Sequence, residues 1–375
     1  MAGSKTGTIF QVTTWGESHG TGLGVTVDGC PAGLSLDASD IQLYLDRRKP
    51  GQSRYATPRK EDDAAELLSG VFEGKTTGTP ISVAVYNKNQ QSKDYSEIAS
   101  YYRPGHADFT FDEKYGFRDY RGGGRSSGRE TIGRVAAGAI AAKLLAQLGV
   151  TFTTFTRSIG PVRVSDDRFC AEEIAKNPLC MPDAEAAEAA AAYLDACMAD
   201  QDSSGGVVEC IIHGVPSGIG DPVFDKLDAA LAKAVMSIGA VKGFEIGDGF
   251  AAAKATGKGN NDPFCRTKDG KPAKMSNHAG GILGGISDGS DIILRAAVKP
   301  TPSISAAQQT VRRDGEEIEI SIRGRHDPVI VPRAVVVVEA MAAITVADAM
   351  LVNMSARLDA VKRFYGSDPL SGGRI

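Results

Sequence analysis

A glycine-rich segment with several arginines is the stretch whose residue types most clearly predict chemistry. Residues 122–134 read GGGRSSGRETIGR. The glycines let the backbone pass close to a ligand, and Ser127 followed by Glu130 has the spacing of a capping box at a helix start. Cations at a helix N-terminus oppose the helix dipole by about 0.3–1 kcal/mol each, so their concentration here predicts a bound anion rather than a plain turn with solvated side chains. The arginines are Arg121, Arg125, Arg129 and Arg134.

Two short loops each present an imidazole beside other polar groups. In the run GESHG, Ser18 and His19 are adjacent. This is weak evidence for a nucleophile and its base, because neighbouring side chains usually point apart. In the run RPGHAD, His106 is followed by Asp108. Asp108 could orient His106 or cap the next helical turn, and the spacing leaves both interpretations open.

Basic residues recur beside glycine and proline in other segments. Residues 47–60 carry several arginines among Gly, Ser and Pro, which predicts a mobile basic loop, although a solvated charge run is the commoner outcome. Residues 299–303 read KPTPS, a lysine and hydroxyls on a proline-stiffened backbone, which suits a phosphate. Pro328 disfavours helical geometry at Asp327, so this carboxylate is expected at a strand-to-helix corner.

Hydrophobic patterns predict the elements that position these segments. Strands are expected at residues 9–13, 23–27, 81–86, 150–155, 207–213, 292–298 and 316–322. Helices are expected from the Asp37 cap to Pro50, after Glu130, and at residues 183–198, 222–236 and 332–360. The helix after Glu130 has these apolar residues on one face: Ile132, Val135, Ala136, Ala139, Ile140 and Leu144. Residues 263–274 are predicted to form a second mobile loop and residues 364–375 a flexible tail. The absence of repeats and clean linkers favours a single catalytic domain over residues 1–375, with mixed α and β structure.

Composition restricts the class of partner. The net charge of −4 argues against nucleic acid and favours small anions held in a local basic pocket. The six cysteines form no CxxC pair, so no disulfide framework and no metal site is expected. The apolar run at residues 331–352 contains Arg333, Glu339 and Asp348, which indicates a buried helix rather than a membrane span. With no signal-peptide pattern at the N-terminus, we expect a cytoplasmic protein with no membrane partner.

Taken together, the motifs resemble those of the chorismate synthase family, over nearly the full length of the chain. Three signatures occur in order: GESHG continuing to VDGCP, GRSSGRET continuing to Gly138, and RHDP continuing to Glu339 and Ala340. The intervening RPGH and KPTPS runs match as well. One such motif would be suggestive, whereas the ordered set is highly specific.

The resemblance implies an α+β fold with helices sandwiched between antiparallel sheets, in a homotetramer. It also implies a lyase that converts 5-enolpyruvylshikimate 3-phosphate to chorismate and phosphate by a 1,4-trans elimination. This reaction requires reduced FMN without net redox change. An alternative is a bifunctional form that also reduces its own flavin with NADPH, although no dinucleotide fingerprint supports it. A non-catalytic anion- or RNA-binding module is disfavoured by the net charge and by the few aromatic residues near the basic loops.

Site residues carry over from the family by motif. His19 would protonate the departing phosphate and His106 would act near flavin N1, while Asp327, Ser18 and Ser127 would tune proton transfer. At Gly239, where many members have Asn or Pro, only a backbone contact is expected. The substrate anions would be held by Arg48, Arg54, Arg103 and Arg129. FMN contacts would come from Arg125, Ser126, Ser127, Gly239, Ala240, Gly284, Lys299, Pro300, Thr301, Pro302, Ser303 and Arg325.

Overall fold

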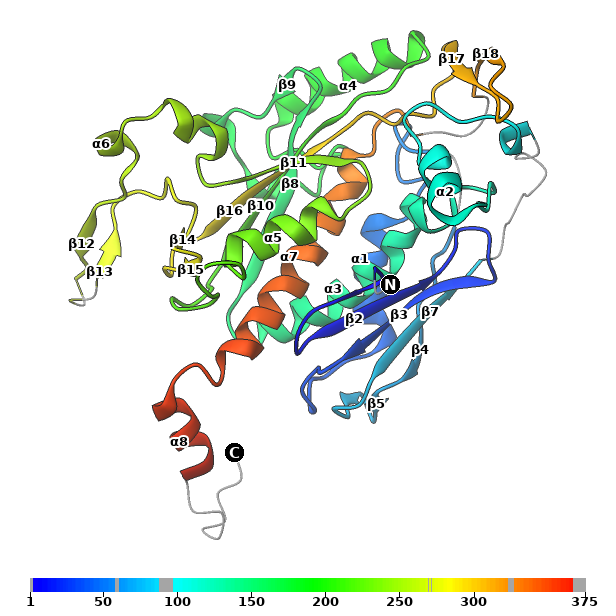
Figure 1. Ribbon diagram of the computed structural model, residues 1–375. Coiled ribbons are helices and arrows are strands. Elements are labelled where there is room, and N and C mark those ends of the chain that lie inside the picture. Colours follow the sequence, from blue (N-terminus) through cyan, green and yellow to red (C-terminus); the bar gives the residue numbers. More distant parts are fainter. Residues whose placement is uncertain are drawn as a thin grey trace.

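Two antiparallel sheets enclose a layer of helices in the computed structural model (Figure 1), which describes residues 3–57, 61–87, 97–268, 270, 272–322 and 327–366. Each of the two main sheets has five strands. This is the α+β arrangement expected from the sequence. The layer between the sheets is where most of the apolar side chains are buried.

The first sheet has the strand order β1-β2-β3-β7-β4 and the second has the order β11-β16-β10-β8-β9. Val25 on β3 pairs with Val83 on β7, and Cys210 on β10 pairs with Leu294 on β16, so apolar residues lie side by side on the inner faces. The strands of the first sheet are β1 (Lys5–Thr6), β2 (Gln11–Gly16), β3 (Gly22–Asp28), β4 (Glu66–Ser69) and β7 (Ile81–Tyr86). Those of the second are β8 (Thr151–Ile159), β9 (Val162–Arg163), β10 (Gly206–His213), β11 (Val241–Ile246) and β16 (Ile292–Val298).

The enclosed layer contains α1 (Ala38–Arg48), α3 (Thr131–Ala146) and α7 (Val331–Asn353). Helix α3 packs on the first sheet and on α7, and α7 packs on the second sheet. Small residues let α3 and α7 approach closely: a Cβ added to Gly138 would lie 2.2 Å from the Cβ of Ala340. Helix α3 is therefore buried almost all round rather than on one face, and of the expected face only Leu144 is partly exposed.

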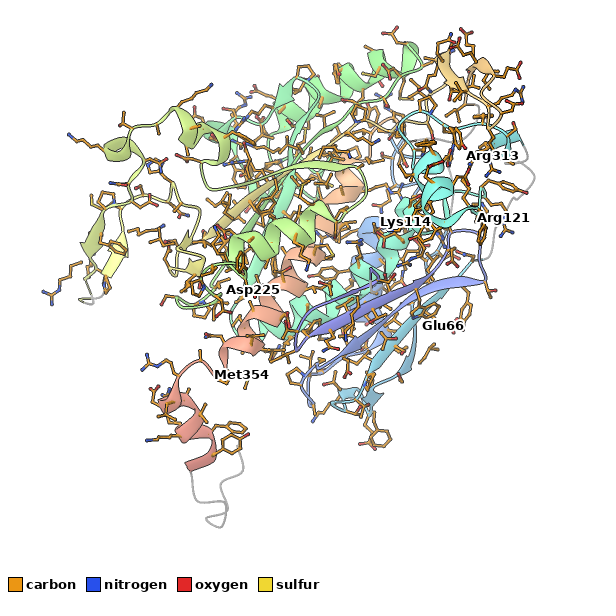
Figure 2. All side chains as sticks on the ribbon, in the orientation of Figure 1. Glu66, Lys114, Arg121, Asp225, Arg313 and Met354 are labelled. Atoms are coloured by element: carbon orange, nitrogen blue, oxygen red, sulfur yellow. The ribbon has the colours of Figure 1, made fainter. Side chains whose placement is uncertain are left out.

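Helix α7 is long and apolar enough to cross a membrane by length and composition, and 67% of its most apolar stretch is buried inside the protein. It is the buried helix that the sequence indicates. The expectation of one helix over residues 332–360 is wrong, since α7 ends at Asn353 and α8 (Leu358–Gly366) follows as a separate helix. Met354 marks the junction (Figure 2) and is 61% exposed, because the chain leaves the apolar layer there.

Helix caps explain where several elements begin. Asp37 caps α1 as expected, accepting hydrogen bonds from the amides of Ser39 and Asp40. The predicted capping box at α3 is wrong. The Ser127 hydroxyl accepts from the amide of Arg129 at 3.3 Å, and the Glu130 carboxylate is held instead by Arg134 Nε at 2.8 Å. A short 3-10 turn, η4 (Gly128–Glu130), therefore precedes α3.

The start of the first sheet is held by the far end of the chain. Asp348 on α7 accepts hydrogen bonds from the amides of Thr8, Ile9 and Phe10 at 2.7–2.8 Å. Strand β2 consequently begins at Gln11 rather than at the expected Ile9, because the amides before it are engaged by this carboxylate.

The remaining elements lie around this frame. Helix α4 follows the expected Asp183 cap, whereas α5 starts five residues later than residue 222. The other helices are α2 (Asp108–Tyr115), α4 (Ala184–Ala199), α5 (Leu227–Met236) and α6 (Gly257–Asn260). The short two-stranded ribbons pair β5 (Val71–Phe72) with β6 (Lys75–Thr76), β12 (Phe264–Arg266) with β13 (Pro272–Lys274), β14 (Ile282–Leu283) with β15 (Ile286–Ser287), and β17 (Gln308–Val311) with β18 (Glu317–Ile320).

The three segments expected to be flexible contain regular secondary structure in the parts that the structure describes. Arg47 and Arg48 belong to the last turn of α1 rather than to a basic loop, and residues 58–60 lie outside the described part. Residues 263–274 contain the ribbon β12–β13, with residues 269 and 271 outside the description. Residues 364–366 end α8, and the rest of the expected tail lies outside the described residues.

Candidate functional site

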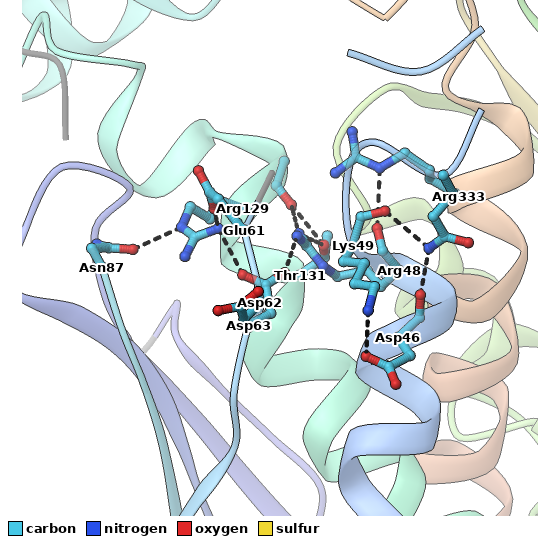
Figure 3. Close-up of polar contacts among 12 residues, drawn as sticks. Asp46, Arg48, Lys49, Glu61, Asp62, Asp63, Asn87, Arg129, Thr131 and Arg333 are labelled. Carbon is cyan, nitrogen blue, oxygen red and sulfur yellow. Dashed lines mark hydrogen bonds and ion pairs between the residues drawn. The ribbon is translucent and has the colours of Figure 1, made fainter. Parts of the chain in front are cut away.

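Two of the arginines assigned to the substrate meet at one carboxylate (Figure 3). Asp63 Oδ2 is 2.7 Å from Arg48 Nη2, and Asp63 Oδ1 is 2.9 Å from Arg129 Nη1. Arg48 comes from the end of α1, Arg129 from the turn before α3, and Asp63 from the irregular chain before β4. Glu61 also contacts Arg129. Three distant segments therefore place two guanidinium groups together.

Asn87 connects this pair to the loop that carries His19. Its side-chain oxygen accepts from Arg129 Nε at 2.8 Å (Figure 3), and its amide nitrogen donates to the carbonyl of Gly20 at 2.8 Å. Asn87 follows β7 and the loop follows β2, so both positions are set by the first sheet. The predicted imidazole loop and the arginine pair are thus parts of one network.

His19 packs against the glycine-rich segment. A Cβ added to Gly122 would lie 2.2 Å from His19 Cε1, and Gly122 has a φ of +65°, so only glycine allows this approach. Ser18 Oγ lies 3.2 Å from His19 Nδ1 and 3.4 Å from the carbonyl of Gly122. Hydrogen bonds from Arg121, and to a smaller extent the charge of His19, lower the pKa of Asp119. Ser18 and His19 are both buried.

His106 belongs to a second part of the same region. Its Nε2 is 2.7 Å from the hydroxyl of Ser303, and Lys299 Nζ donates to the carbonyl of Gly105 at 2.7 Å. A Cβ on Gly105 would lie 2.8 Å from Pro302. The RPGH turn and the KPTPS run, which are far apart in the sequence, are therefore packed together.

Asp108 performs neither of the two roles considered for it. Its carboxylate accepts from Arg103 Nε and Nη2, both at 2.8 Å, and from the Arg103 amide, while Ala107 occupies the cap position of α2. Burial alone would raise the pKa of Asp108, but the hydrogen bonds and charge of Arg103 and the charge of Arg118 outweigh it and lower the pKa. Arg103 is thereby fixed beside Gly123, whose added Cβ would lie 3.9 Å from Arg103 Nη2.

Asp327 lies at the expected corner and joins the arginine pair from the opposite side. Its carboxylate accepts from the Thr57 amide and from Arg333 Nη1, each at 2.8 Å. Arg333 Nε in turn donates to the carbonyl of Arg48 at 3.1 Å. The carbonyl of Pro328 accepts from the Ser204 amide at 2.9 Å, which anchors this corner to the start of β10.

The remaining arginines of the glycine-rich segment bind protein groups. Arg125 donates to the carbonyl of Gly16 at 3.0 Å and to the hydroxyl of Thr14 at 2.6 Å, and the Ser126 hydroxyl donates to the carbonyl of Gly123 at 2.7 Å. Arg121 lies at the surface (Figure 2), paired with Asp119.

Arg134 secures the turn that carries Gly239 and Ala240. Its Nη1 donates to the Ser237 hydroxyl at 2.6 Å and its Nη2 donates to the Ser237 carbonyl at 3.1 Å. Ala240 has a φ of 72°, and its carbonyl accepts from the amide of Lys299 at 2.9 Å. The predicted cofactor contacts at residues 239–240 and 299–303 are therefore adjacent.

Two predicted site residues, Arg54 and Gly284, are not brought into this network. Arg54 turns toward α4, where it binds Asp195 at 2.6 Å, and its side chain is 65% exposed. Gly284 lies in the turn between β14 and β15, before the start of β16, whereas Lys299 follows its end. Arg325 lies outside the described residues.

A hollow of about 260 Å³ lies behind Tyr55, lined by side chains of α4 and the segment before it. None of the predicted site residues lines it. Within the described part of the chain, no three His, Cys, Asp or Glu side chains are grouped closely enough to hold a metal ion.

Four residues of this network were not predicted from the sequence: Asp63, Asn87, Arg333 and Ser237. An acidic run directly after a basic run, as in residues 59–63, is the signal that could have suggested Asp63. Asn87 and Ser237 are single polar residues whose partners are distant in sequence, and Arg333 binds both nearby Asp327 and the distant carbonyl of Arg48.

The site suits a small, multiply charged anion. Arg48 is 2% exposed, and its Nε has no hydrogen-bond acceptor among the described residues. Burial lowers the pKa of Arg48 and the Asp63 carboxylate opposes this, but a guanidinium keeps its proton in proteins. Burial, together with the charge of Lys242, lowers the pKa of Lys299. A buried cationic donor without an acceptor and a glycine cradle beside an imidazole are features that a bound anionic ligand would complete.

Comparison with known proteins gives one consistent result. The family model described as chorismate synthase matches residues 10–351. A chorismate synthase of Agathobacter rectalis is 71% identical over 97% of this chain and 99% of its own length. One of Methanosarcina barkeri is 56% identical over 94% of this chain and 97% of its own. A solved structure titled Crystal Structure of Chorismate Synthase aligns with a TM-score of 0.74 at 32% identity, covering 96% of this chain and 97% of that one.

Proposed function

Since this chain belongs to the chorismate synthase family of lyases, we propose that it converts 5-enolpyruvylshikimate 3-phosphate to chorismate and phosphate by a 1,4-trans elimination with reduced FMN. The observation that carries the proposal is the buried guanidinium of Arg48, which is paired through Asp63 with Arg129 and whose Nε has no acceptor among the described residues. A substrate with a phosphate and two carboxylates supplies the charge and the acceptors that this arrangement lacks.

The arginines would bind the substrate and set its orientation. Arg48, Arg103 and Arg129 are each held by a carboxylate or an amide, so they would meet the anion with little reorganisation. Arg54 would join them only through a change of its present contact with Asp195.

The imidazoles and hydroxyls would handle protons. His19, whose Nδ1 lies 3.2 Å from Ser18 Oγ, would deliver a proton to the departing phosphate. His106, whose Nε2 contacts Ser303, would hold a proton on the cofactor side. Asp327 would tune this region through Arg333, and Ser127 stays a proposed partner whose hydroxyl already accepts one amide.

The residues that would hold FMN fit a phosphorylated cofactor. Reduced FMN, when bound, supplies the transient electron and the acceptor for the substrate proton. Lys299 to Ser303 would take its phosphate end, and the adjacent turn with Gly239 and Ala240 would offer backbone groups. Arg125, Ser126, Ser127, Gly284 and Arg325 remain proposed contacts, of which Gly284 lies apart from the others in a single chain.

The test is phosphate release from the ester under nitrogen, with and without added reduced FMN. Release that depends on reduced FMN, with a cofactor that is not consumed, supports the proposal. Release without flavin, or none with it, contradicts the proposal. For the bifunctional alternative we expect NADPH alone to leave the FMN absorbance unbleached under nitrogen, because the sequence has no dinucleotide fingerprint.

We further propose that the protein is a cytoplasmic homotetramer with a single catalytic domain, with no nucleic-acid or membrane partner. Large apolar side chains exposed in the isolated chain support assembly: Phe224 is 90% and Phe250 77% exposed. Light scattering coupled to size-exclusion chromatography tests this, and a monomer at micromolar concentration would contradict it.

A further inference from the structure

We infer that Asp63 is a positioning residue that holds Arg48 and Arg129 together as one anion-binding unit. The inference rests on the proposed function, because that assigns both arginines to the substrate. Asp63 belongs to none of the motifs that identify the family. What sets it apart is its position between two guanidinium groups, one from the end of α1 and one from the turn before α3.

The carboxylate divides its two oxygens between the two arginines. Oδ2 is 2.7 Å from Arg48 Nη2, and Oδ1 is 2.9 Å from Arg129 Nη1 (Figure 3). The exposed fractions of the side chains are 0% for Asp63, 2% for Arg48 and 13% for Arg129. A carboxylate that is shielded from solvent and bridges two cations fixes the distance between them, because breaking either ion pair would leave a buried charge without its partner.

Other contacts of Arg48 are too weak to set its position. Its Nη1 is 3.4 Å from both the carbonyl of Gly128 and the hydroxyl of Thr131, which is at the limit of a hydrogen bond. Arg129 is also held by Asn87 at 2.8 Å. Asp63 is therefore the main anchor of Arg48 and the link from it to Arg129.

The backbone at Asp63 supports a functional placement. Its φ is 44°, in the left-handed region that residues other than glycine, asparagine and aspartate seldom adopt. Such a conformation persists where the surroundings determine it, and these sites are often functional. Asparagine tolerates the same conformation and has the same shape, so Asp63→Asn changes the charge and leaves the backbone in place.

Arg48 retains a donor for a ligand after it has bound Asp63. Its Nε is buried and has no acceptor in the part of the chain that the structure describes. If Asp63 only neutralised the charge of Arg48, it would compete with the substrate, and removing its charge would tighten substrate binding. A carboxylate that positions the pair predicts the opposite, since asparagine can accept from one guanidinium but presents its NH2 group to the other.

The experiment measures KM and kcat for 5-enolpyruvylshikimate 3-phosphate with the full chain and reduced FMN under nitrogen. Asp63→Asn should raise KM about 10- to 100-fold, as expected for the loss of one charge-assisted hydrogen bond, and leave kcat and the Kd of FMN within about threefold. Asp62→Asn is the matched control, because it makes the same charge change on an exposed neighbour and should leave KM unaltered.

A double-mutant cycle separates positioning from a general effect on the fold. In an Arg48→Met background, Asp63→Asn should raise KM less than about threefold further, because the pair is already broken. If Asp63→Asn alone fails to fold, the double variant removes both buried charges and keeps this comparison measurable.

An unchanged or lower KM for Asp63→Asn, an equal effect of Asp62→Asn, or additive effects with Arg48→Met would each overturn the inference. Absence of turnover by the wild-type protein would instead contradict the proposed function. The two failures are therefore distinguishable.

Discussion

Replacing Gly122 by alanine should disable the site through a single methyl group. The added Cβ would lie 2.2 Å from His19 Cε1, 2.4 Å from His19 Nδ1 and 3.0 Å from Ser18 Oγ. Non-bonded carbon atoms settle about 3.5–4.0 Å apart, so the imidazole must retreat by roughly 1 Å or more. The φ of +65° adds a backbone cost of about 1–2 kcal/mol.

A displacement of this size at a catalytic group costs about 10²-fold in rate. We therefore expect Gly122→Ala to lower kcat by about 10²-fold, measured as phosphate release with reduced FMN under nitrogen. Thermal unfolding of the same samples separates this loss from a loss of fold.

Two other glycines provide controls that separate the contact with His19 from the backbone cost of a positive φ. Gly116 has a φ of +77° with nothing within 4 Å, so Gly116→Ala should lose stability but keep kcat. Gly128 has neither a positive φ nor a neighbour within 4 Å, so Gly128→Ala should resemble the wild type. Wild-type kcat in Gly122→Ala, or an equal loss in Gly116→Ala, would refute the argument that contact with His19 is what matters.

Three further outcomes follow from the contacts of the site. His19→Ala and His106→Ala should each lower kcat about 10²- to 10⁴-fold with the Kd of FMN unchanged, whereas Arg48→Ala should mainly raise KM. Steady-state kinetics and FMN titration measure these effects. Wild-type turnover in both histidine variants would mean that the imidazoles are structural. Arg134→Met should raise the Kd of FMN about tenfold, because the turn at residues 237–240 loses its hydrogen bonds to that guanidinium, and Arg121→Met, which changes an exposed pair, should leave the Kd unaltered. The lowered pKa of Asp108 means that its pairing stabilises the fold fully above the unfolded value of about 3.9 and is lost as pH falls through the folded pKa. Asp108→Asn should thus be less stable than the wild type at pH 7 in urea unfolding, and a gap that did not shrink below about pH 4 would contradict this.

Local signals in the sequence predicted individual elements well. Strand β16 occupies residues 292–298 as expected, and α1 begins at the Asp37 cap, since alternation and capping are decided by neighbouring residues. Helix α3 follows Glu130 as expected, but the predicted capping box does not form, because Arg134 draws the Glu130 carboxylate away from it. The end of α7 was missed because composition does not reveal where a helix leaves the layer between two sheets.

The site was predictable in its residue types and much less so in its connections. His106 and Ser303 were both named from the sequence, but their contact depends on packing between segments almost two hundred residues apart. No motif in the sequence marks Asp63, and only the tertiary structure shows it buried between two arginines. Long-range pairing of this kind leaves no periodic trace in a single sequence.

The hydrogen bonds that Asp348 accepts from the amides of Thr8, Ile9 and Phe10 have a consequence for folding during synthesis. The carboxylate that secures these amides is translated 338–340 residues after them, and α7 fills the space between the sheets. A nascent chain on the ribosome therefore lacks this support for the first sheet until α7 has emerged. Premature termination before α7 should leave α3 and the second sheet with bare apolar faces, a substrate for chaperones and proteases rather than a smaller working enzyme.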